Sequence, residues 1–308
     1  MDGVICVTGV SSIQDYVFGT NRLRENVGGS GLVEHSSRQF RGFAEADDGK
    51  PLFTGGGNNA AVFYGEDALA RTRGAVWEWS RRFLRIAPGL RLTAAHEPFT
   101  AGRLAEAYLQ ARERLAQVEE APPFGAPLGA LPLSRYCSST RGPASSKEDG
   151  DWLSDEALAK RKFENDHRDD RFPRRLDLLD RDGASHIAII HADGDGIGAS
   201  FKELADDFSS NGRSDDDFRS AIRRKSEQLD SATRTAFDHI LSDLQKLKPA
   251  LIKDGIIDPS NYENDPQLLP IRPIIRAGDD VTFITPGRIG LSLAVRYLES
   301  FHRAAKEM

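Results

Sequence analysis

The chain has 308 residues, 29% of them charged, and a formal net charge of -6 at pH 7, so it can bury a large core and its length suggests two domains. The negative charge argues against a free-standing, non-specific nucleic-acid binder, because such proteins need clustered Lys and Arg to contact phosphates. The start of the chain has no basic segment followed by a long apolar run, and no stretch reaches the ~20 apolar residues of a membrane helix, so we expect a cytoplasmic protein with no membrane partner.

The N-terminal region predicts strands and helices in alternation. Ser11 or Ser12 would cap the first helix, and the glycine-containing residues 21–31 interrupt the pattern before the second. The expected elements, in chain order, are a strand at residues 4–9, a helix at 11–18, a helix at 32–46, a hairpin at 51–64 with Gly and Asn at its tip, a helix at 66–86, a strand at 90–95 and a helix at 101–118.

Residues 121–182 form a less regular linker, rich in proline at its start and in alternating charges toward its end. We expect a helix near residues 154–165. Arg171, Arg174 and Arg175 could contact RNA or phosphate, but the interspersed acids favour a salt-bridged surface.

A second group of elements begins at residue 186. Ile187 and the next three residues are apolar, which is typical of a strand covered on both faces, and Asp193 and Asp195 follow where that strand ends. Residues 271–285 read as a β-hairpin with Ala277-Gly278-Asp279-Asp280 at its tip.

The helices of this second group are expected at residues 199–208, 214–248 and 288–306, the second with Ser214 and Asp217 as a variant capping box. Two sets of apolar residues at helical spacing mark the expected faces of the longer helices: Phe237, Ile240, Leu241, Leu244 and Leu247 in one, and Leu291, Ala294, Val295 and Leu298 in the other.

If the strand and the hairpin are neighbours in one sheet, Asp193 meets Asp279 and Asp280. Three carboxylates at one place repel each other unless a divalent cation lies among them, and oxygen ligands suit Mg²⁺ or Mn²⁺. Magnesium held by few carboxylates leaves room for phosphate oxygens, which points to phosphoryl or nucleotidyl transfer. Each motif alone would be explained by an ordinary turn, but the two together favour the metal site.

Glycines after Asp193 lead into a helix, an arrangement that lets backbone N–H groups approach a triphosphate. The candidate nucleotide-binding residues here are Gly194, Asp195, Gly196, Gly198, Lys202 and Gly278. Asp195 either binds metal or shapes the turn, and we favour the turn. His191 is expected to pack rather than to bind Mg²⁺, which prefers oxygen.

The order strand, helix, helix, hairpin, helix therefore occurs twice, which predicts an α+β chain with two copies of a βααββα unit. The expected domains are residues 1–120, a mostly helical linker at 121–182, and residues 183–308. Where the second copy has Asp193 and Asp279-Asp280, we expect the first to have Gly9 and Asn58-Asn59, which cannot supply the charge that a metal needs.

The chain resembles the large subunit of type III CRISPR effector complexes, a cyclic-oligoadenylate synthetase whose two palm domains are related to GGDEF cyclases. The resemblance covers nearly the whole chain. The residues that carry it are GVSSIQDYVF at 9–18, Arg22, Arg24, GGS at 28–30 and GGG at 55–57 in the first copy, and HADGDG at 191–196 and AGDD at 277–280 in the second.

The resemblance implies ferredoxin-like palm domains and a nucleotidyltransferase that converts ATP into cyclic or linear oligoadenylate messengers in antiviral defence. It implies two Mg²⁺ or Mn²⁺ ions on Asp193, Asp279 and Asp280, which would be the catalytic residues, and a second nucleotide pocket lined by Ser11 and Ser12, although helix capping explains these serines equally well. Other CRISPR effector subunits and guide or target RNA are the implied partners.

The chain also departs from that family. It has no HD nuclease motif, so DNA cleavage is not expected; Cys137 stands alone where the family has paired cysteines, so zinc is not expected; Ala277 replaces a glycine of the hairpin. The second palm looks truncated, and the four-helix domain that follows it in the family is missing. The alternatives are a catalytically silent nucleotide-binding or scaffolding subunit of a ribonucleoprotein, and a related mononucleotide or diguanylate cyclase, which the AGDDV sequence disfavours.

Overall fold

The computed structural model describes residues 2–120, 135–140, 142–179, 186–263 and 265–306. It divides into two compact units, one made of Met1–Phe163 with Gly196–Ser226 and the other of Glu164–Asp195 with Glu227–Met308. Within the described residues, no helix combines the length and the apolar composition needed to span a bilayer.

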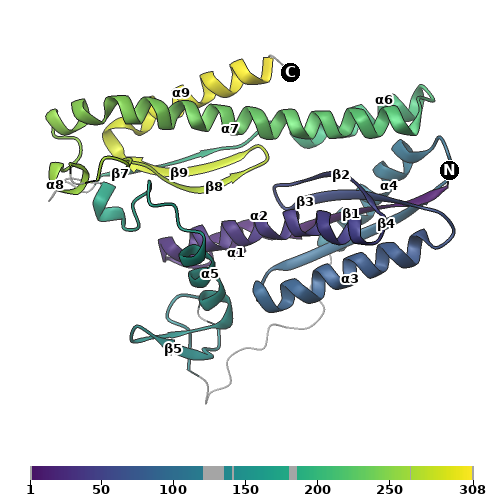
Figure 1. Cartoon of the computed structure of the whole chain (residues 1–308), viewed down its shortest axis with the longest axis horizontal. Helices are drawn as coiled ribbons and strands as arrows, with labels where there is room; N and C mark the ends of the chain where they lie inside the picture. The colour runs from purple at the N-terminus through teal and green to yellow at the C-terminus, as the bar shows by residue number, and fades with distance from the viewer. Residues whose placement is uncertain (1, 121–134, 141, 180–185, 264, 307–308) are drawn as a thin grey trace. The chain divides into compact units, whose positions relative to one another are not determined.

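The first unit contains the first βααββα copy, the connecting segment as far as Phe163, and two helical segments from later in the chain (Figure 1). Its elements are β1 (Gly3–Ser11), α1 (Ile13–Phe18), α2 (Leu23–Ala46), β2 (Lys50–Gly55), β3 (Asn58–Tyr64), α3 (Ala68–Ile86), β4 (Arg91–Phe99), α4 (Leu104–Glu120), β5 (Ser146–Glu148), β6 (Asp151–Leu153), most of α5 (Asp155–Asp166), α6 (Ile197–Ser210) and the start of α7 (Asp215–Lys253).

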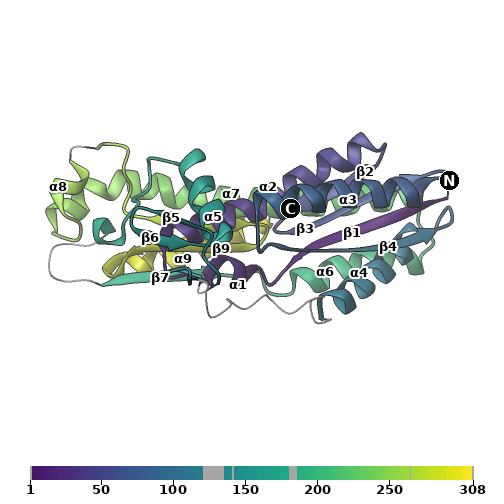
Figure 2. The same ribbon diagram turned by 90° about the horizontal axis from the view of Figure 1, so that it is seen from below.

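The first sheet is antiparallel, with the strand order β2-β3-β1-β4 (Figure 2). Val4 and Cys6 are as deeply buried as Ile5 and Val7 on the alternate face of β1, so both faces of this strand are covered. Helices α2 and α3 contact the sheet, and α4 contacts β1 and β4.

Helix α6 belongs to the core of this first unit. It lies beside α4 in Figures 1 and 2, and Phe208 and the α7 residues Phe218 and Ile222 join the apolar cluster that contains Ile5 and Val7. Asp215, the first residue of α7, accepts hydrogen bonds from the backbone N–H groups of Gly102 (2.7 Å) and Leu104 (2.9 Å) at the start of α4. The compact units thus differ from the expected domains, which assign α6 to the second copy.

Helix α2 starts at Leu23 and runs through the glycines that were expected to interrupt it. The reason is the close approach of α5. A β-carbon at Gly28 would lie 1.8 Å from the Lys160 carbonyl oxygen, and one at Gly31 would lie 2.4 Å from the Phe163 ring. Glycine is poor in isolated helices, but here it lets two helices cross.

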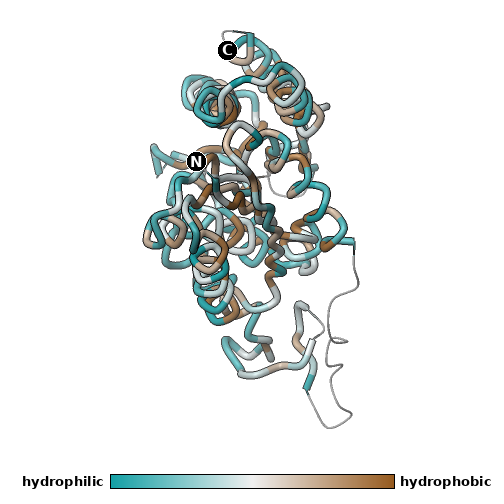
Figure 3. The backbone as a smooth tube through the Cα atoms, turned by 90° about the vertical axis from the view of Figure 1, so that its right-hand side faces the viewer, coloured by the Kyte–Doolittle hydropathy of each residue, from teal (hydrophilic) through white to brown (hydrophobic). Residues whose placement is uncertain are grey.

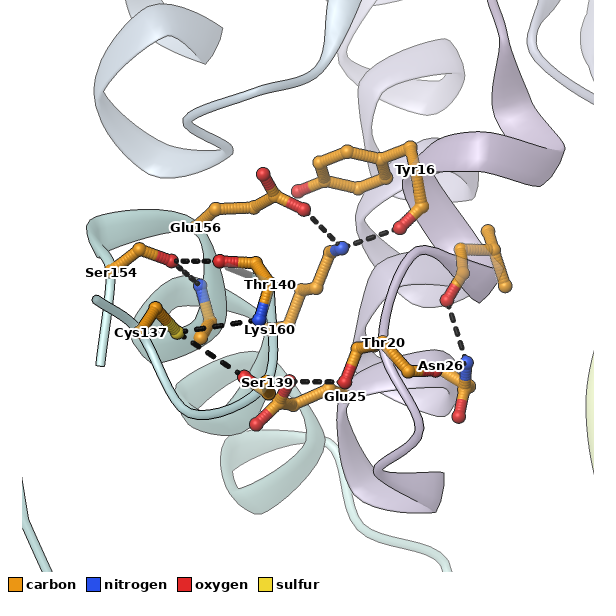
Figure 4. Close-up of polar contacts among 12 residues, drawn as sticks. Tyr16, Thr20, Glu25, Asn26, Cys137, Ser139, Thr140, Ser154, Glu156 and Lys160 are labelled. Carbon is orange, nitrogen blue, oxygen red and sulfur yellow. Dashed lines mark hydrogen bonds and ion pairs between the residues drawn. The ribbon is translucent and has the colours of Figure 1, made fainter. Parts of the chain in front are cut away.

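Buried polar contacts connect α5 to α1, as Figure 4 shows, and also to α2. The Lys160 ammonium is fully buried, lies 2.5 Å from Glu156 Oε1, donates to the Tyr16 carbonyl and stands 4.0 Å from the centre of the Tyr16 ring. One helical position on, Arg161 pairs with the buried Glu25 at 2.7 Å. These pairs satisfy charges that would otherwise be costly to bury.

A mostly helical linker was expected, but outside α5 its described residues carry the short β5–β6 hairpin and a 3₁₀ turn at Leu176–Leu179. The predicted helix near residues 154–165 is confirmed by α5. Cys137 Sγ accepts a hydrogen bond from the Thr140 N–H at 3.4 Å (Figure 4). The salt-bridged interpretation of the arginines is also confirmed, because Arg171, Arg174 and Arg175 pair with Asp169, Glu164 and Asp177.

The second unit has a three-stranded antiparallel sheet in the order β7-β9-β8. Its further elements are β7 (Ile187–Ala192), the rest of α7, α8 (Pro259–Tyr262), β8 (Arg272–Ala277), β9 (Asp280–Pro286) and α9 (Gly287–Lys306). Helices α7 and α9 cover one face, where Phe237, Leu244 and Tyr297 pack with Val281 and Phe283. Along the backbone in Figure 3, brown apolar residues alternate with teal polar ones in the helices, as amphipathic packing requires.

Two expectations about burial in this unit are wrong. Among the described residues β7 pairs with β9 alone, and Ile189 on its uncovered face is 66% exposed, so the strand is not covered on both faces. In α9 the buried residues are Gly290, Leu293, Tyr297 and Ser300, whereas Leu291 is 80% exposed, so the expected apolar face points outward. In α7, Phe237, Ile240, Leu241 and Leu244 are buried as expected, but Leu247 is exposed.

Candidate functional site

The end of β7 and the β8–β9 turn bring two carboxylates together. Ala192 pairs with Val281, and Ala277 pairs with Asp280 around the two-residue turn Gly278-Asp279. Asp193, one residue beyond Ala192, therefore stands opposite Asp280, and their side chains are hydrogen-bonded to each other. The expected meeting of Asp193 with the hairpin follows from this register.

The electrostatics of the pair show that negative charge is crowded here. Burial raises the pKa of Asp280 to about 6, helped by the hydrogen bond to Asp193 and by the charges of Asp193 and Asp279, while His191 acts in the opposite direction. Burial, and then the charge of Asp193, also raises the pKa of Asp279. Among the ion pairs of the described residues, none neutralises Asp193, Asp279 or Asp280. This uncompensated carboxylate pair fits a divalent cation with oxygen ligands.

The third carboxylate does not complete a ligand set. In the part of the chain that the structure describes, no group of three or more His, Cys, Asp or Glu side chains has an arrangement that could hold a metal ion. Asp193 and Asp280 are thus directly paired, and Asp279 contributes its charge from the turn.

His191 lies on the same face of β7 as the exposed Ile189, two residues before Asp193. It is exposed, and its Nδ1 is 2.8 Å from Thr282 Oγ1 on the neighbouring strand. Its contact is therefore a polar cross-strand pair beside the acids rather than the packing that the sequence suggested.

Two buried residues behind the acids were missed in the sequence. Thr233 of α7 donates from Oγ1 to the Gly278 carbonyl at 2.6 Å, and the buried Tyr297 of α9 lies beside Thr233 and in the field of Asp279 and Asp280. A signal for Thr233 was present, because it falls at helical spacing from Phe237 and Ile240 as a polar residue on an apolar face. Tyr297 was missed because the sequence predicted that the other face of α9, which carries Leu291 and Leu298, would be buried.

The other candidate residues around the glycine-rich segment fall on both sides of a unit boundary. Gly194 and Asp195 follow Asp193 in the second unit, and Gly278 opens the turn with φ 61°. Gly196, which has φ 71° and precedes α6, belongs to the first unit together with Gly198 and the exposed Lys202. The positive φ explains the glycine at 196, whereas a β-carbon at Gly198 would meet nothing within 4 Å.

The first unit repeats the hairpin without the acids. Gly9 pairs with Asn58, and Gly55 pairs with Asn58 around the turn Gly56-Gly57. The positions equivalent to Asp193, Asp279 and Asp280 are thus Gly9, Gly57 and Asn58, one residue away from the expected match of Asn58-Asn59 to the two hairpin acids. Asn59 instead is buried and donates to Thr8 Oγ1 at 3.0 Å.

Ser11 and Ser12 do not cap α1 through their side chains. Ser12 takes the N-cap position with φ 55° and makes no side-chain cap hydrogen bond. Ser11 is buried, and its Oγ has no hydrogen-bond partner within the described residues. A buried hydroxyl without a partner is unfavourable, so capping does not account for Ser11.

Known proteins resemble this chain in structure but not in sequence. No protein-family model matches the sequence, and no curated protein is significantly similar to it. Csm1 from T. onnurineus matches with a TM-score of 0.56 at 15% identity, covering 99% of this chain and 46% of that one. The Csm1–Csm4 cassette in complex with pppApApA matches with a TM-score of 0.58 at 13% identity, covering 99% of this chain and 47% of that one. The cassette in complex with one ATP matches with the same TM-score at 15% identity, covering 99% of this chain and 48% of that one. The fold is that of Csm1.

This likeness agrees with the resemblance to the large subunit of type III CRISPR complexes that the motifs indicated. The chain spans a little under half the length of the Csm1 structures that it matches. Other Csm1–Csm4 structures in the comparison contain cA4 and cA3.

Proposed function

We propose that the chain is the palm region of a metal-dependent nucleotidyltransferase that converts ATP into cyclic or linear oligoadenylate with release of pyrophosphate, within a type III CRISPR effector. The observation that carries this proposal is the crowded pair Asp193 and Asp280, with Asp279 beside it, at the end of β7 on a Csm1 fold. Csm1 structures bound to ATP and to oligoadenylates support the choice of substrate and product.

In this proposal Asp193, Asp279 and Asp280 hold two Mg²⁺ or Mn²⁺ ions. When bound, such ions activate a ribose hydroxyl and neutralise charge on the reacting α-phosphate. The carboxylates are suited to this role because ionisation of all three is unfavourable without a cation, as the raised pKa values of Asp279 and Asp280 indicate.

The remaining candidate residues would bind the nucleotide. Gly194 and Gly196 would offer backbone N–H groups to phosphates, with Asp195 shaping the turn between them. In the first unit, the unpartnered Ser11 hydroxyl would donate to or accept from a second nucleotide, which supplies the hydrogen bond that the protein does not.

One observation favours a different function, a nucleotide-binding or scaffolding subunit without turnover. The first unit has Gly9, Gly57 and Asn58 at the positions equivalent to the three acids, so one palm of the two has no carboxylate pair of this kind. The Csm1–Csm4 cassettes support a partner subunit in either case.

Incubation of the purified chain with ATP and Mn²⁺ or Mg²⁺, with products resolved by mass, tests the proposal. We expect pyrophosphate and oligoadenylate from the wild-type chain, and a loss of at least about 100-fold in the Asp279→Ala/Asp280→Ala variant. Asp206→Ala, which removes an exposed acid from α6, is the matched control and should retain activity.

Tight binding of ATP without any metal-dependent product would contradict the transferase proposal and support the scaffolding subunit. Equal activity of the wild-type and the double variant would show that the turnover comes from another site or a contaminant.

A further inference from the structure

Two buried side chains, Thr233 and Tyr297, lie behind the tip of the β8–β9 hairpin on the side of the core. Thr233 of α7 is 3% exposed, and its hydroxyl donates to the Gly278 carbonyl at 2.6 Å. Gly278 immediately precedes Asp279 and adopts a positive φ of 61°. This hydrogen bond therefore fixes the peptide unit from which Asp279 and then Asp280 extend.

Tyr297 of α9 supports the threonine in turn. It is 2% exposed and lies beside Thr233. Burial raises the pKa of Tyr297 to about 12, Thr233 lowers it, and the charges of Asp279 and Asp280 raise it. The tyrosine hydroxyl is therefore protonated at neutral pH and can donate to Thr233 Oγ1, whose own hydrogen goes to Gly278.

At the equivalent turn of the first unit, the carbonyl of Gly56, which corresponds to Gly278, accepts a hydrogen bond from the exposed Asn58 side chain at 3.5 Å and not from a buried hydroxyl. A β-carbon at Gly57 would meet Ile13 Cδ1 at 2.7 Å and Val33 Cγ1 at 3.5 Å, so aliphatic side chains lie behind that tip. Its position is fixed by a backbone hydrogen bond from Val10 N to the Gly57 carbonyl at 2.9 Å. Within the described residues, buried hydroxyl groups, those of Thr233 and Tyr297, thus lie behind the hairpin that carries the acids and not behind the hairpin that lacks them.

We propose that Thr233 and Tyr297 are positioning residues that hold the hairpin tip so that Asp280 faces Asp193 and the two carboxylates can share a divalent cation. This inference rests on the proposed function. Groups that orient metal-binding carboxylates restrict their conformations before the metal arrives, and their loss commonly weakens metal affinity by about 10- to 100-fold.

The test uses the full chain, with Mn²⁺ alone as the probe, and the variants Thr233→Val and Tyr297→Phe, which remove one hydroxyl each. Mn²⁺ affinity is measured by electron paramagnetic resonance or calorimetry. We expect it to fall about 10-fold in both variants, and to be restored in Thr233→Ser, which keeps the hydroxyl. Amide hydrogen exchange at residues 277–281 of the metal-free protein should become faster in Thr233→Val.

Two variants in the same unit remove buried hydrogen bonds of the same kinds elsewhere. Thr285 Oγ1 donates to the Pro270 carbonyl at 2.9 Å, and the Tyr262 hydroxyl donates to the Leu178 carbonyl at 2.7 Å. Thr285→Val and Tyr262→Phe should lower thermal stability but leave Mn²⁺ affinity and exchange at the hairpin tip unchanged.

Unchanged exchange at residues 277–281 in Thr233→Val, or an equal loss of Mn²⁺ affinity in the site variants and the two controls, would overturn the inference. If the wild-type chain binds no Mn²⁺, the proposed function fails, and the exchange experiment on metal-free protein still decides whether Thr233 holds the hairpin.

Discussion

At the scale of single residues, the opposition of Asp193 and Asp280 is the feature with the clearest energetic consequence. Carboxylates that face each other across a sheet stabilise the fold when a cation joins them and destabilise it when none is present. The same pair therefore lowers the stability of the metal-free protein and provides the driving force for binding a divalent ion.

We predict that Asp280→Asn raises the stability of the metal-free chain. The folded-state pKa of Asp280, about 6, lies above its value in the unfolded chain, so ionisation of this carboxyl at higher pH opposes folding. After allowance for solvent screening, we expect a gain of about 1 kcal/mol at pH 7.5, measured by urea unfolding in the presence of a chelator.

The exposed Asp195 supplies the control, since Asp195→Asn should leave stability within about 0.5 kcal/mol of the wild type. A less stable Asp280→Asn protein would show that the pair is not repulsive in the folded state.

At the scale of elements, the crossing of α2 and α5 depends on missing side chains. Gly28→Ala should destabilise the chain by about 1–3 kcal/mol, because its β-carbon would collide with the Lys160 backbone. Gly42 lies in the same helix with nothing within 4 Å of a β-carbon, so Gly42→Ala should instead stabilise by up to about 1 kcal/mol.

Urea unfolding of the two variants separates the steric effect of the α2–α5 crossing from the effect of helix propensity on stability. If both substitutions stabilise the protein, α2 and α5 do not approach each other as closely as described.

Much of the element pattern could be predicted from local sequence. Short apolar runs predicted the strands, and the glycines followed by Asn in the first hairpin and by Asp in the second predicted both hairpins. The register of the second hairpin then brings Asp193 close to Asp280. The extension of α2 through Gly28 could not be predicted, because its cause is α5, more than a hundred residues later. The buried face of α9 was predicted wrongly because Leu291 and Leu298 are more hydrophobic than Gly290, which packs against the sheet, and the buried Ser300.

At the scale of the whole molecule, the two copies of the sequence repeat do not coincide with the two compact units. The second copy, residues 183–308, contributes Phe208, Phe218 and Ile222 to the core of the first unit. We predict that this fragment, produced alone, exposes these apolar side chains, binds the dye ANS and associates in solution.

Phe208→Glu/Phe218→Glu in the isolated fragment should reduce ANS binding and association, and the same substitutions should unfold the first unit in the full chain. A monodisperse wild-type fragment with no ANS binding would contradict the prediction.

The position of α6 and the start of α7 also sets an order of events during synthesis. The β1 residues Ile5 and Val7 are among the first to leave the ribosome, yet their partners Phe218 and Ile222 are made some two hundred residues later. Until then one face of the N-terminal sheet stays partly uncovered, and such transiently exposed apolar surface is prone to aggregation. The nascent chain should therefore depend on chaperones through most of its translation, and pauses upstream of codon 218 should reduce its soluble yield more than pauses downstream of codon 226.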